Sequence, residues 1–161
     1  MIHSGPGGTH QILYYRALKL NQMPEIVISE QVDLTRQKIS EWLGEATQSA
    51  GYTYSPEHLL LQVVDDDGDI IGGLAGATNW NWLYIETLAI APQHRNRGYA
   101  RQLMGRAEEI ARERGCCGSW VDTFTFQVPE FYQGLGYEPF GELARYPAEQ
   151  SRIFLRKYFE Q

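Results

Sequence analysis

A strand, a glycine-containing turn and an amphipathic helix follow one another between residues 80 and 115, and this junction constrains the fold most strongly. Residues 80–90 are rich in β-branched and aromatic side chains, which predicts a strand. Gly115 is typical of the position just past a helix, and two arginines before it suit the negative pole of a helix. Apolar residues recur at helical spacing between the turn and this glycine: Ala100, Leu103, Met104, Ala107, Ile110 and Ala111.

Shorter patterns predict the rest of an α+β domain. Asp33 is a candidate helix N-cap, and the apolar stripe after it predicts a helix that faces a core. The members of this stripe are Leu34, Ile39, Trp42, Leu43 and Ala46. Pro129 opens a short predicted helix that ends near residue 133. The other predicted strands are residues 25–29, 59–64, 70–77, 120–126, 137–143 and 152–159.

The acidic run at residues 65–69 predicts a tight hairpin turn, because its Asp67-Gly68 step supplies the required backbone conformation. The run lacks the ligand spacing and the closing Glu of an EF-hand, so we expect a solvated turn rather than a calcium loop. The four histidines of the chain show no zinc-ligand spacing. No metal is therefore expected.

Length and charge limit the classes of function. With 161 residues, the chain is expected to contain a single domain, residues 23–161, preceded by a partly flexible extension, residues 1–22. The net charge of −6 disfavours a nucleic-acid or anionic-membrane binder. The charge is uneven, since residues 39–94 contain eight acidic residues and no Lys or Arg, whereas residues 95–114 contain six arginines.

Cys116 and Cys117 are the two cysteines of the chain, and their adjacency offers no disulfide framework. Together with the lack of a long apolar run or a signal-peptide pattern, this predicts a cytoplasmic protein. Both cysteines follow the end of a predicted helix, where the helix dipole disfavours a thiolate. Catalysis through an acyl-cysteine is therefore disfavoured.

The turn at residues 93–101 is a candidate phosphate site, because free backbone N–H groups converge where a helix begins. Arg95 and Arg97 add positive charge there, and Gly98 allows the backbone to approach a ligand closely. The alternative is an ordinary turn with solvated arginines. The sequence fingerprints of P-loop and Rossmann nucleotide sites are both absent.

The segment Arg95-Asn96-Arg97-Gly98-Tyr99-Ala100 resembles the R/Q-x-x-G-x-G/A signature of the GNAT superfamily, the Gcn5-related N-acetyltransferases. In that family this loop holds the pyrophosphate of acetyl-coenzyme A (acetyl-CoA). Residues 84–92 resemble the family strand that leads into the loop, and residues 131–137 resemble its later F/L-Y-x-x-L-G-F/Y motif. The three motifs together cover about residues 80–140.

The resemblance implies a three-layer α/β/α fold with a mixed, mostly antiparallel sheet of six to seven strands and about four helices. It also implies acetyl-CoA as the donor and direct attack by a primary amine in a ternary complex. Unpaired backbone groups on a splayed strand would receive the pantetheine and the acetyl carbonyl. The implied coenzyme-binding residues are Leu88, Ala89, Ile90, Arg95, Asn96, Arg97, Gly98, Tyr99, Ala100, Arg101 and Tyr132.

Glu86 and Tyr132 are the candidates for the proton transfers. Strand alternation places Glu86 on one face with Trp80, Trp82 and Tyr84, where partial desolvation would raise its pKa towards that of a general base. The resemblance puts the family's base or water-holding Glu near this position; the alternative is an exposed strand carboxylate. Tyr132 matches the family tyrosine that protonates the leaving thiolate, and the alternative is a packing residue.

Asp122 is the main candidate for contact with the acceptor, and it shares a predicted strand face with Trp120 and Phe124. It is either part of the acceptor pocket or a satisfied polar residue. Trp82 and Tyr84 are either pocket or core residues. The chain departs from many relatives at Thr125, where they carry an Asn, so a coenzyme contact from that side chain is in doubt.

The acidic segment before residue 94 predicts a cationic small amine as the acceptor, with a peptide amine as the alternative. The resemblance also suggests a homodimer. Two other functions stay open at this point: a non-catalytic acyl-CoA sensor on the same fold, and transfer of a longer acyl group.

Overall fold

The structure is a computed structural model that describes residues 24–160. The predicted extension, residues 1–22, lies outside the described residues, so the predicted domain boundary stays a prediction. The chain divides into two compact units, residues 1–43 and 44–161, which are described separately. Within residues 24–160, no helix is both long and apolar enough to cross a membrane.

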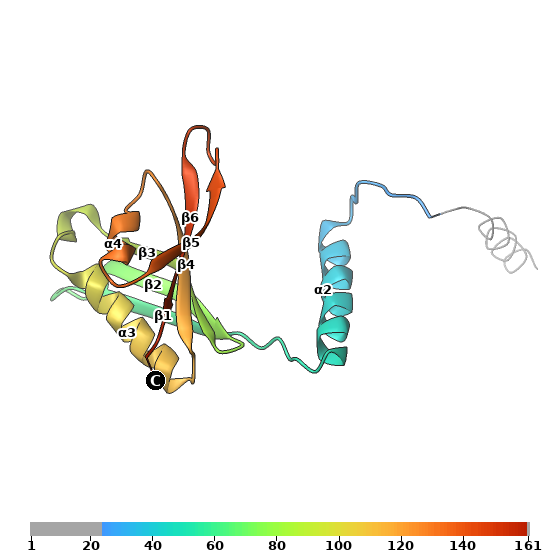
Figure 1. Cartoon of the computed structure of the whole chain (residues 1–161), viewed down its shortest axis with the longest axis horizontal. Coiled ribbons are helices and arrows are strands. Elements are labelled where there is room, and N and C mark those ends of the chain that lie inside the picture. The colour runs from blue at the N-terminus through green and yellow to red at the C-terminus, as the bar shows by residue number, and fades with distance from the viewer. Residues whose placement is uncertain (1–23, 161) are drawn as a thin grey trace, which may run out of the picture. The chain divides into compact units, whose positions relative to one another are not determined.

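A six-stranded sheet in the order β1-β2-β3-β4-β6-β5 forms the centre of the larger unit (Figure 1). All neighbouring strands are antiparallel except β3 and β4, which are parallel. This mixed, mostly antiparallel sheet confirms the predicted fold class, and residues 24–160 contain three α-helices where about four were expected for the chain. The strands are β1 (Glu57–Val64), β2 (Ile70–Asn79), β3 (Trp82–Ile90), β4 (Gly118–Phe124), β5 (Glu138–Ala144) and β6 (Ser151–Tyr158).

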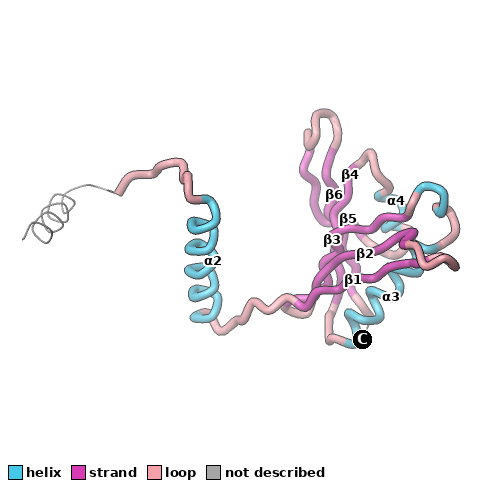
Figure 2. Tube along the Cα trace, turned by 180° about the vertical axis from the view of Figure 1, so that it is seen from behind, coloured by secondary structure: helices cyan, strands magenta, loops and turns pink. Residues whose placement is uncertain are grey.

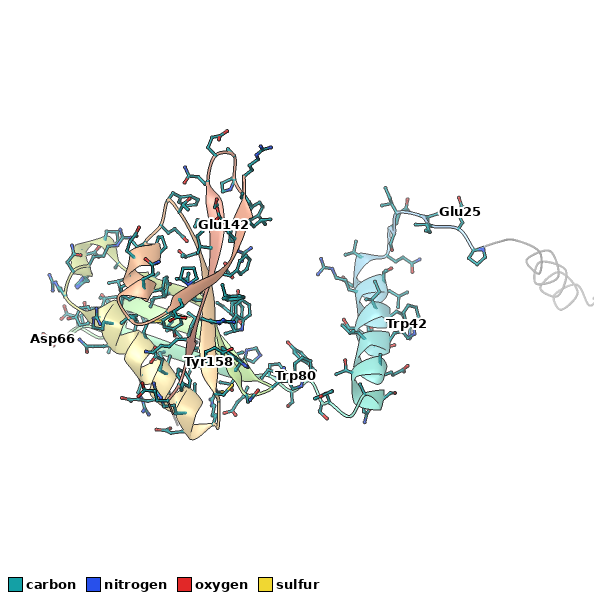
Figure 3. All side chains as sticks on the ribbon, in the orientation of Figure 1. Glu25, Trp42, Asp66, Trp80, Glu142 and Tyr158 are labelled. Carbon is teal, nitrogen blue, oxygen red and sulfur yellow. The ribbon has the colours of Figure 1, made fainter. Side chains whose placement is uncertain are left out.

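The turn between β1 and β2 is held by its first aspartate. The Asp65 carboxylate accepts hydrogen bonds from the backbone N–H groups of Asp67 (3.1 Å) and Asp69 (2.9 Å). Gly68 has a φ of 86°, which favours glycine. Figure 3 shows Asp66 at the tip of this hairpin. The run therefore forms the tight turn that the sequence predicts.

Helix α3 (Tyr99–Glu113) packs its apolar stripe on the sheet and closes the core. Its buried Met104 and Ala107 lie in one cluster with Leu83, Ile85 and Leu155 of the strands. A buried carboxylate on the same helix, Glu108, is satisfied by Lys157 Nζ (2.7 Å) and Arg112 Nη2 (3.3 Å). The helix ends at Gly115, whose φ of 76° confirms its predicted position.

Strand β3 contains a bulge at Glu86. Ala75 of β2 pairs with Thr87 and Gly76 pairs with Ile85, so Glu86 is an extra residue without a cross-strand partner. The extra residue reverses which side chains of β3 face the core. Before the bulge these are the odd-numbered Leu83 and Ile85, and after it they are the even-numbered Leu88 and Ile90.

Strands β3 and β4 part directly at this bulge. Their parallel pairing covers only Trp82 to Ile85 on β3 and Gly118 to Val121 on β4. Beyond these residues β3 pairs only with β2, and β4 pairs only with β6. In Figures 1 and 2, β1 to β3 run across the view whereas β4 and β6 run more steeply.

Helix α2 (Val32–Ser49) confirms the predicted helix but not its surroundings. None of its residues is buried, and Trp42 is 62% exposed and projects from the helix in Figure 3. That its stripe faces a core stays a prediction, because helical spacing predicts an apolar face but not what covers it. Asp33 lies inside the first turn; Gln31 O accepts the bond from Thr35 N that begins the helix.

One predicted strand is absent and the limits of others differ, since β4 is Gly118–Phe124 rather than residues 120–126. Residues 25–29 form no strand; Ile26 is fully exposed, so its β propensity has no sheet partner among the described residues. The third strand begins at Trp82 rather than at Trp80, because Trp80 and Asn81 form the left-handed turn after β2, with φ values of 47° and 62°. Trp80 therefore does not share the strand face of Trp82.

Replacing Gly76 with Ala should disturb the bulge, because the added Cβ would collide with the backbone carbonyl oxygen of Tyr84. We expect the free energy of unfolding to fall by about 1–3 kcal/mol, together with a loss of activity. Urea denaturation measures the first effect. Gly105→Ala on α3 is the control, since its Cβ meets nothing within 4 Å and should stabilise the helix. Equal stability of the two variants would contradict the assigned register.

Candidate active site

A cavity of about 940 Å³ lies between the parted strands. Its walls come from β3, from β4, from the loop that leads into α3 and from α4 (Pro129–Gln133). The predicted residues on its surface are Glu86, Leu88, Ala89, Ile90, Arg95, Asn96, Gly98, Tyr99, Ala100, Arg101, Asp122 and Tyr132. The structure therefore brings most of the predicted site residues to one cavity.

The start of α3 presents unpaired backbone donors to this cavity. The first bond into the helix joins Gln102 N to Gly98 O (3.1 Å), and no side chain caps the helix. The N–H groups of the three residues between them have no acceptor among the described residues. Asn96 (φ 60°) and Gly98 (φ 84°) turn the loop so that it wraps around this end. Such a helix start binds anions, and a diphosphate fits it.

The arginines of the loop differ in position. Arg95 lines the cavity, and its Nε donates to Ile90 O (3.1 Å), which ties the loop to the end of β3. Arg97 donates from Nη2 to Gln93 O (3.4 Å) and does not line the cavity. The structure therefore supports Arg95 as a contact for an anion and leaves Arg97 as a more distant positive charge.

The edge of β3 that faces the cavity pairs with no strand from Thr87 to Ile90, and of its backbone groups Ile90 O already accepts the bond from Arg95 Nε. In an antiparallel pair, alternate residues direct their N–H and C=O groups away from the partner strand. On β3 these groups point towards the gap left by β4, so they can bond an extended ligand. The splayed edge implied for Leu88, Ala89 and Ile90 is present.

Tyr132 on α4 is buried, with 8% of its surface exposed, and lines the cavity. Burial, followed by the negative charge of Asp122, raises the pKa of its phenol. Its hydroxyl has no hydrogen-bond partner among the described residues. A protonated phenol with an unused donor is therefore available in the cavity.

Glu86 lines the cavity from the bulge but is exposed. The expectation of partial burial beside aromatic rings is wrong, because strand alternation cannot anticipate the extra residue. The carboxylate has no ion-pair or hydrogen-bond partner in the part of the chain that the structure describes. It is a free anion at the rim of the cavity.

Tyr84 and Trp82 lie behind the cavity rather than on its surface. Tyr84 stacks on Trp120 with ring centroids 4.0 Å apart, and Trp82 packs against Tyr158 at 5.2 Å. The Tyr84 hydroxyl donates to Asp122 Oδ1 (3.2 Å), and Asp122 itself lines the cavity. Burial and then Asp122 raise the pKa of Tyr84.

Several lining residues are not among the predicted site residues, although two of them, His94 and Phe131, lie in motifs that the sequence analysis used. They include His94, Thr123, Phe126, Gln127, Val128 and Phe131. Gln127 Oε1 accepts bonds from Thr123 Oγ1 (2.9 Å) and Phe124 N (3.0 Å), which fixes the turn before α4. Thr125 bonds to Gln150 (2.7 Å) and does not line the cavity, so no coenzyme contact from its side chain is supported.

Replacing Gly98 with Asp should separate helix stability from coenzyme binding. At a φ of 84° Asp and Asn side chains are similarly strained, so the melting temperature should fall by a similar amount in the Asp variant and in its Asn control. The charge of Asp would oppose a diphosphate, and we expect the Kd for acetyl-CoA to rise at least about tenfold by calorimetry. Gly98→Asn is the matched neutral control. Unchanged affinity in the Asp variant would exclude this helix start as the anion site.

Comparison with known proteins agrees with this geometry. Residues 24–137 match the family described as the acetyltransferase (GNAT) family. The chain is 36% identical over 101 residues to acetyltransferase Atu2258 of Agrobacterium fabrum, covering 63% of this chain and 74% of that protein. It is 42% identical over 81 residues to the blasticidin-S acetyltransferase of Streptomyces morookaense, covering 50% of this chain and 60% of that one.

The fold agrees as well. The crystal structure of an acetyltransferase from Bacillus cereus superposes with a TM-score of 0.77 at 29% identity, covering 85% of this chain and 99% of that chain. The chain therefore belongs to the GNAT family and is an acetyl-CoA-dependent N-acetyltransferase.

Proposed function

We propose that the protein acetylates a cationic small-molecule amine, with Glu86 as the base or water-holder and Tyr132 as the acid. The observation that carries this proposal is the cavity itself, which has an anion-binding helix start at one end and Glu86, Asp122 and Tyr132 along the rest. The cavity is lined by two carboxylates, Glu86 and Asp122. Asp122 is paired with Arg152, whereas Glu86 has no cationic partner among the described residues. The negative charge of Glu86 therefore favours a positively charged acceptor.

The relatives support a small acceptor. One is named blasticidin-S acetyltransferase, and another, 37% identical over 78 residues, is named streptothricin acetyltransferase. Homologues thus acetylate small-molecule amines. The same class of acceptor is proposed for this chain. A homodimer and a cytoplasmic location stay predictions.

Acetyl-CoA supplies an activated acetyl group as a thioester. The N–H groups at the start of α3 and Arg95 would hold its diphosphate, and the open edge of β3 would hold its pantetheine. A backbone N–H among Leu88 to Ile90 would donate to the acetyl carbonyl oxygen, where negative charge develops.

Transfer then requires three proton movements, because an ammonium acceptor loses one proton before it attacks and a second one, to water, once the C–N bond has formed, while the leaving sulfur gains one. Glu86, directly or through one water, takes the proton of the attacking ammonium, so that a neutral nitrogen forms the new C–N bond. As the C–S bond breaks, the electron pair stays on sulfur and Tyr132 donates its phenolic proton there. The raised pKa of Tyr132 keeps that proton in place at neutral pH.

An acceptor screen tests the proposal directly. Amines, amino acids and peptides are incubated with acetyl-CoA, and free thiol release is followed. We expect the highest turnover with cationic small amines and little with acidic ones. Release of thiol only with peptides would contradict the proposed acceptor class.

Tyr132→Phe should lower kcat about 100-fold, because it removes the proton donor while keeping the ring. The Kd for acetyl-CoA should change by less than about threefold, since the loop and strand contacts remain. Steady-state kinetics and calorimetry measure the two quantities. Unchanged kcat would remove Tyr132 from the mechanism.

The pH profile gives an independent test of the same residue. Because the pKa of Tyr132 is raised above 10.0, the phenol is protonated throughout the neutral range. Activity that depends on its proton is therefore retained throughout the neutral range and lost only at a pH above the ordinary tyrosine pKa. A fall in kcat near pH 8 that disappears in Tyr132→Phe would contradict this assignment.

A further inference from the structure

Asp122 is held from two sides at the point where β4 leaves β3. Its Oδ2 accepts a hydrogen bond from Arg152 Nε (2.6 Å), and Arg152 Nη2 lies 2.6 Å from the same oxygen in an ion pair. Its Oδ1 accepts one bond from the Tyr84 hydroxyl (3.2 Å). The Asp122 side chain is 11% exposed and still lines the cavity. A largely buried carboxylate is thus fixed on the acceptor side.

Arg152 also lies near two aromatic rings. It lies on β6, and its guanidinium is 5.7 Å from the ring centroid of Phe124 and 5.6 Å from that of Phe154. Two donors of one guanidinium reach the same carboxylate, which restrains rotation of both side chains. Sequence motifs gave no indication of this residue, which lies 30 positions after Asp122.

The ion pair changes what Asp122 offers to a ligand. A carboxylate has about four lone-pair sites, and the two described hydrogen bonds with the close Arg152 Nη2 contact leave at least one of them open. Arg152 also neutralises the charge, so the pocket attracts a donor through a hydrogen bond and not through a second net negative charge. The stacked Tyr84 and Trp120 rings keep the Tyr84 hydroxyl on Oδ1.

We propose that Arg152 is a positioning residue for acceptor selection: it orients Asp122 so that the open site receives a second N–H group of the acceptor. This inference rests on the proposed function and deepens it. The preferred acceptors are amines that carry an N–H donor besides the reacting nitrogen.

The test uses paired acceptors that differ in the second donor: butylamine with 1,4-diaminobutane, and phenethylamine with 4-(2-aminoethyl)aniline. For the full chain we expect the second donor to raise kcat/KM about tenfold or more in at least one pair. In Arg152→Met the advantage should fall to about twofold, through a higher acceptor KM with kcat within about threefold. The KM for acetyl-CoA should not change.

Arg156→Met is the matched control. Arg156 lies on the same strand, 5.5 Å and 5.4 Å from the ring centroids of Phe140 and Tyr158, but contacts no carboxylate among the described residues. It should keep the full advantage of the second donor. Arg152→Lys retains the charge with one compact donor and should keep an intermediate advantage.

A double variant distinguishes loss of the Arg152–Asp122 interaction from a general folding defect. If Arg152 acts through Asp122, Asp122→Asn should lose the same advantage, and adding Arg152→Met to it should cause no further loss. Equal effects of Arg152→Met and Arg156→Met, or no donor preference in the full chain, would overturn the inference while acetylation of simple amines stands. Absence of acetyl transfer to any amine would instead overturn the proposed function.

Discussion

The parting of β3 from β4 after four paired residues is the constraint on which the rest of the site depends. The bulge at Glu86 adds one residue to β3 without adding one to β2, and this bends the strand where its pairing with β4 ends. Both strands stay anchored by their other neighbours, so the gap costs few ladder bonds. The gap becomes a cavity with backbone donors on one wall and side chains on the other.

The two ends of this cavity carry opposite electrostatics. At one end, α3 begins without a side-chain cap, so its dipole and free N–H groups favour an anion. At the other, the free Glu86 carboxylate and the neutralised Asp122 favour an amine. The charges are separated along the sequence as well, because the acidic residues 39–94 precede the arginine-rich residues 95–114. Donor and acceptor can therefore approach from different sides.

The sequence predicted the elements around this cavity well, because each has a local cause. Helix α3 follows from its apolar spacing, α4 from Pro129, and the β1–β2 turn from Asp67-Gly68. The bulge could not be predicted. Residues before and after Glu86 both show a strand-like pattern of side chains, and the extra residue is visible only in the pairing with β2. Arg152 was missed for a similar reason, since its meaning depends on the pairing of β4 with β6.

The most direct test of this account is a titration of isotope-labelled protein with acetyl-CoA, followed through its backbone amide NMR signals. The account predicts the largest shifts in two separated stretches, residues 87–90 on the open edge of β3 and residues 96–101 at the start of α3. Shifts concentrated instead around Arg112 and Lys157, at the opposite end of α3, would contradict it.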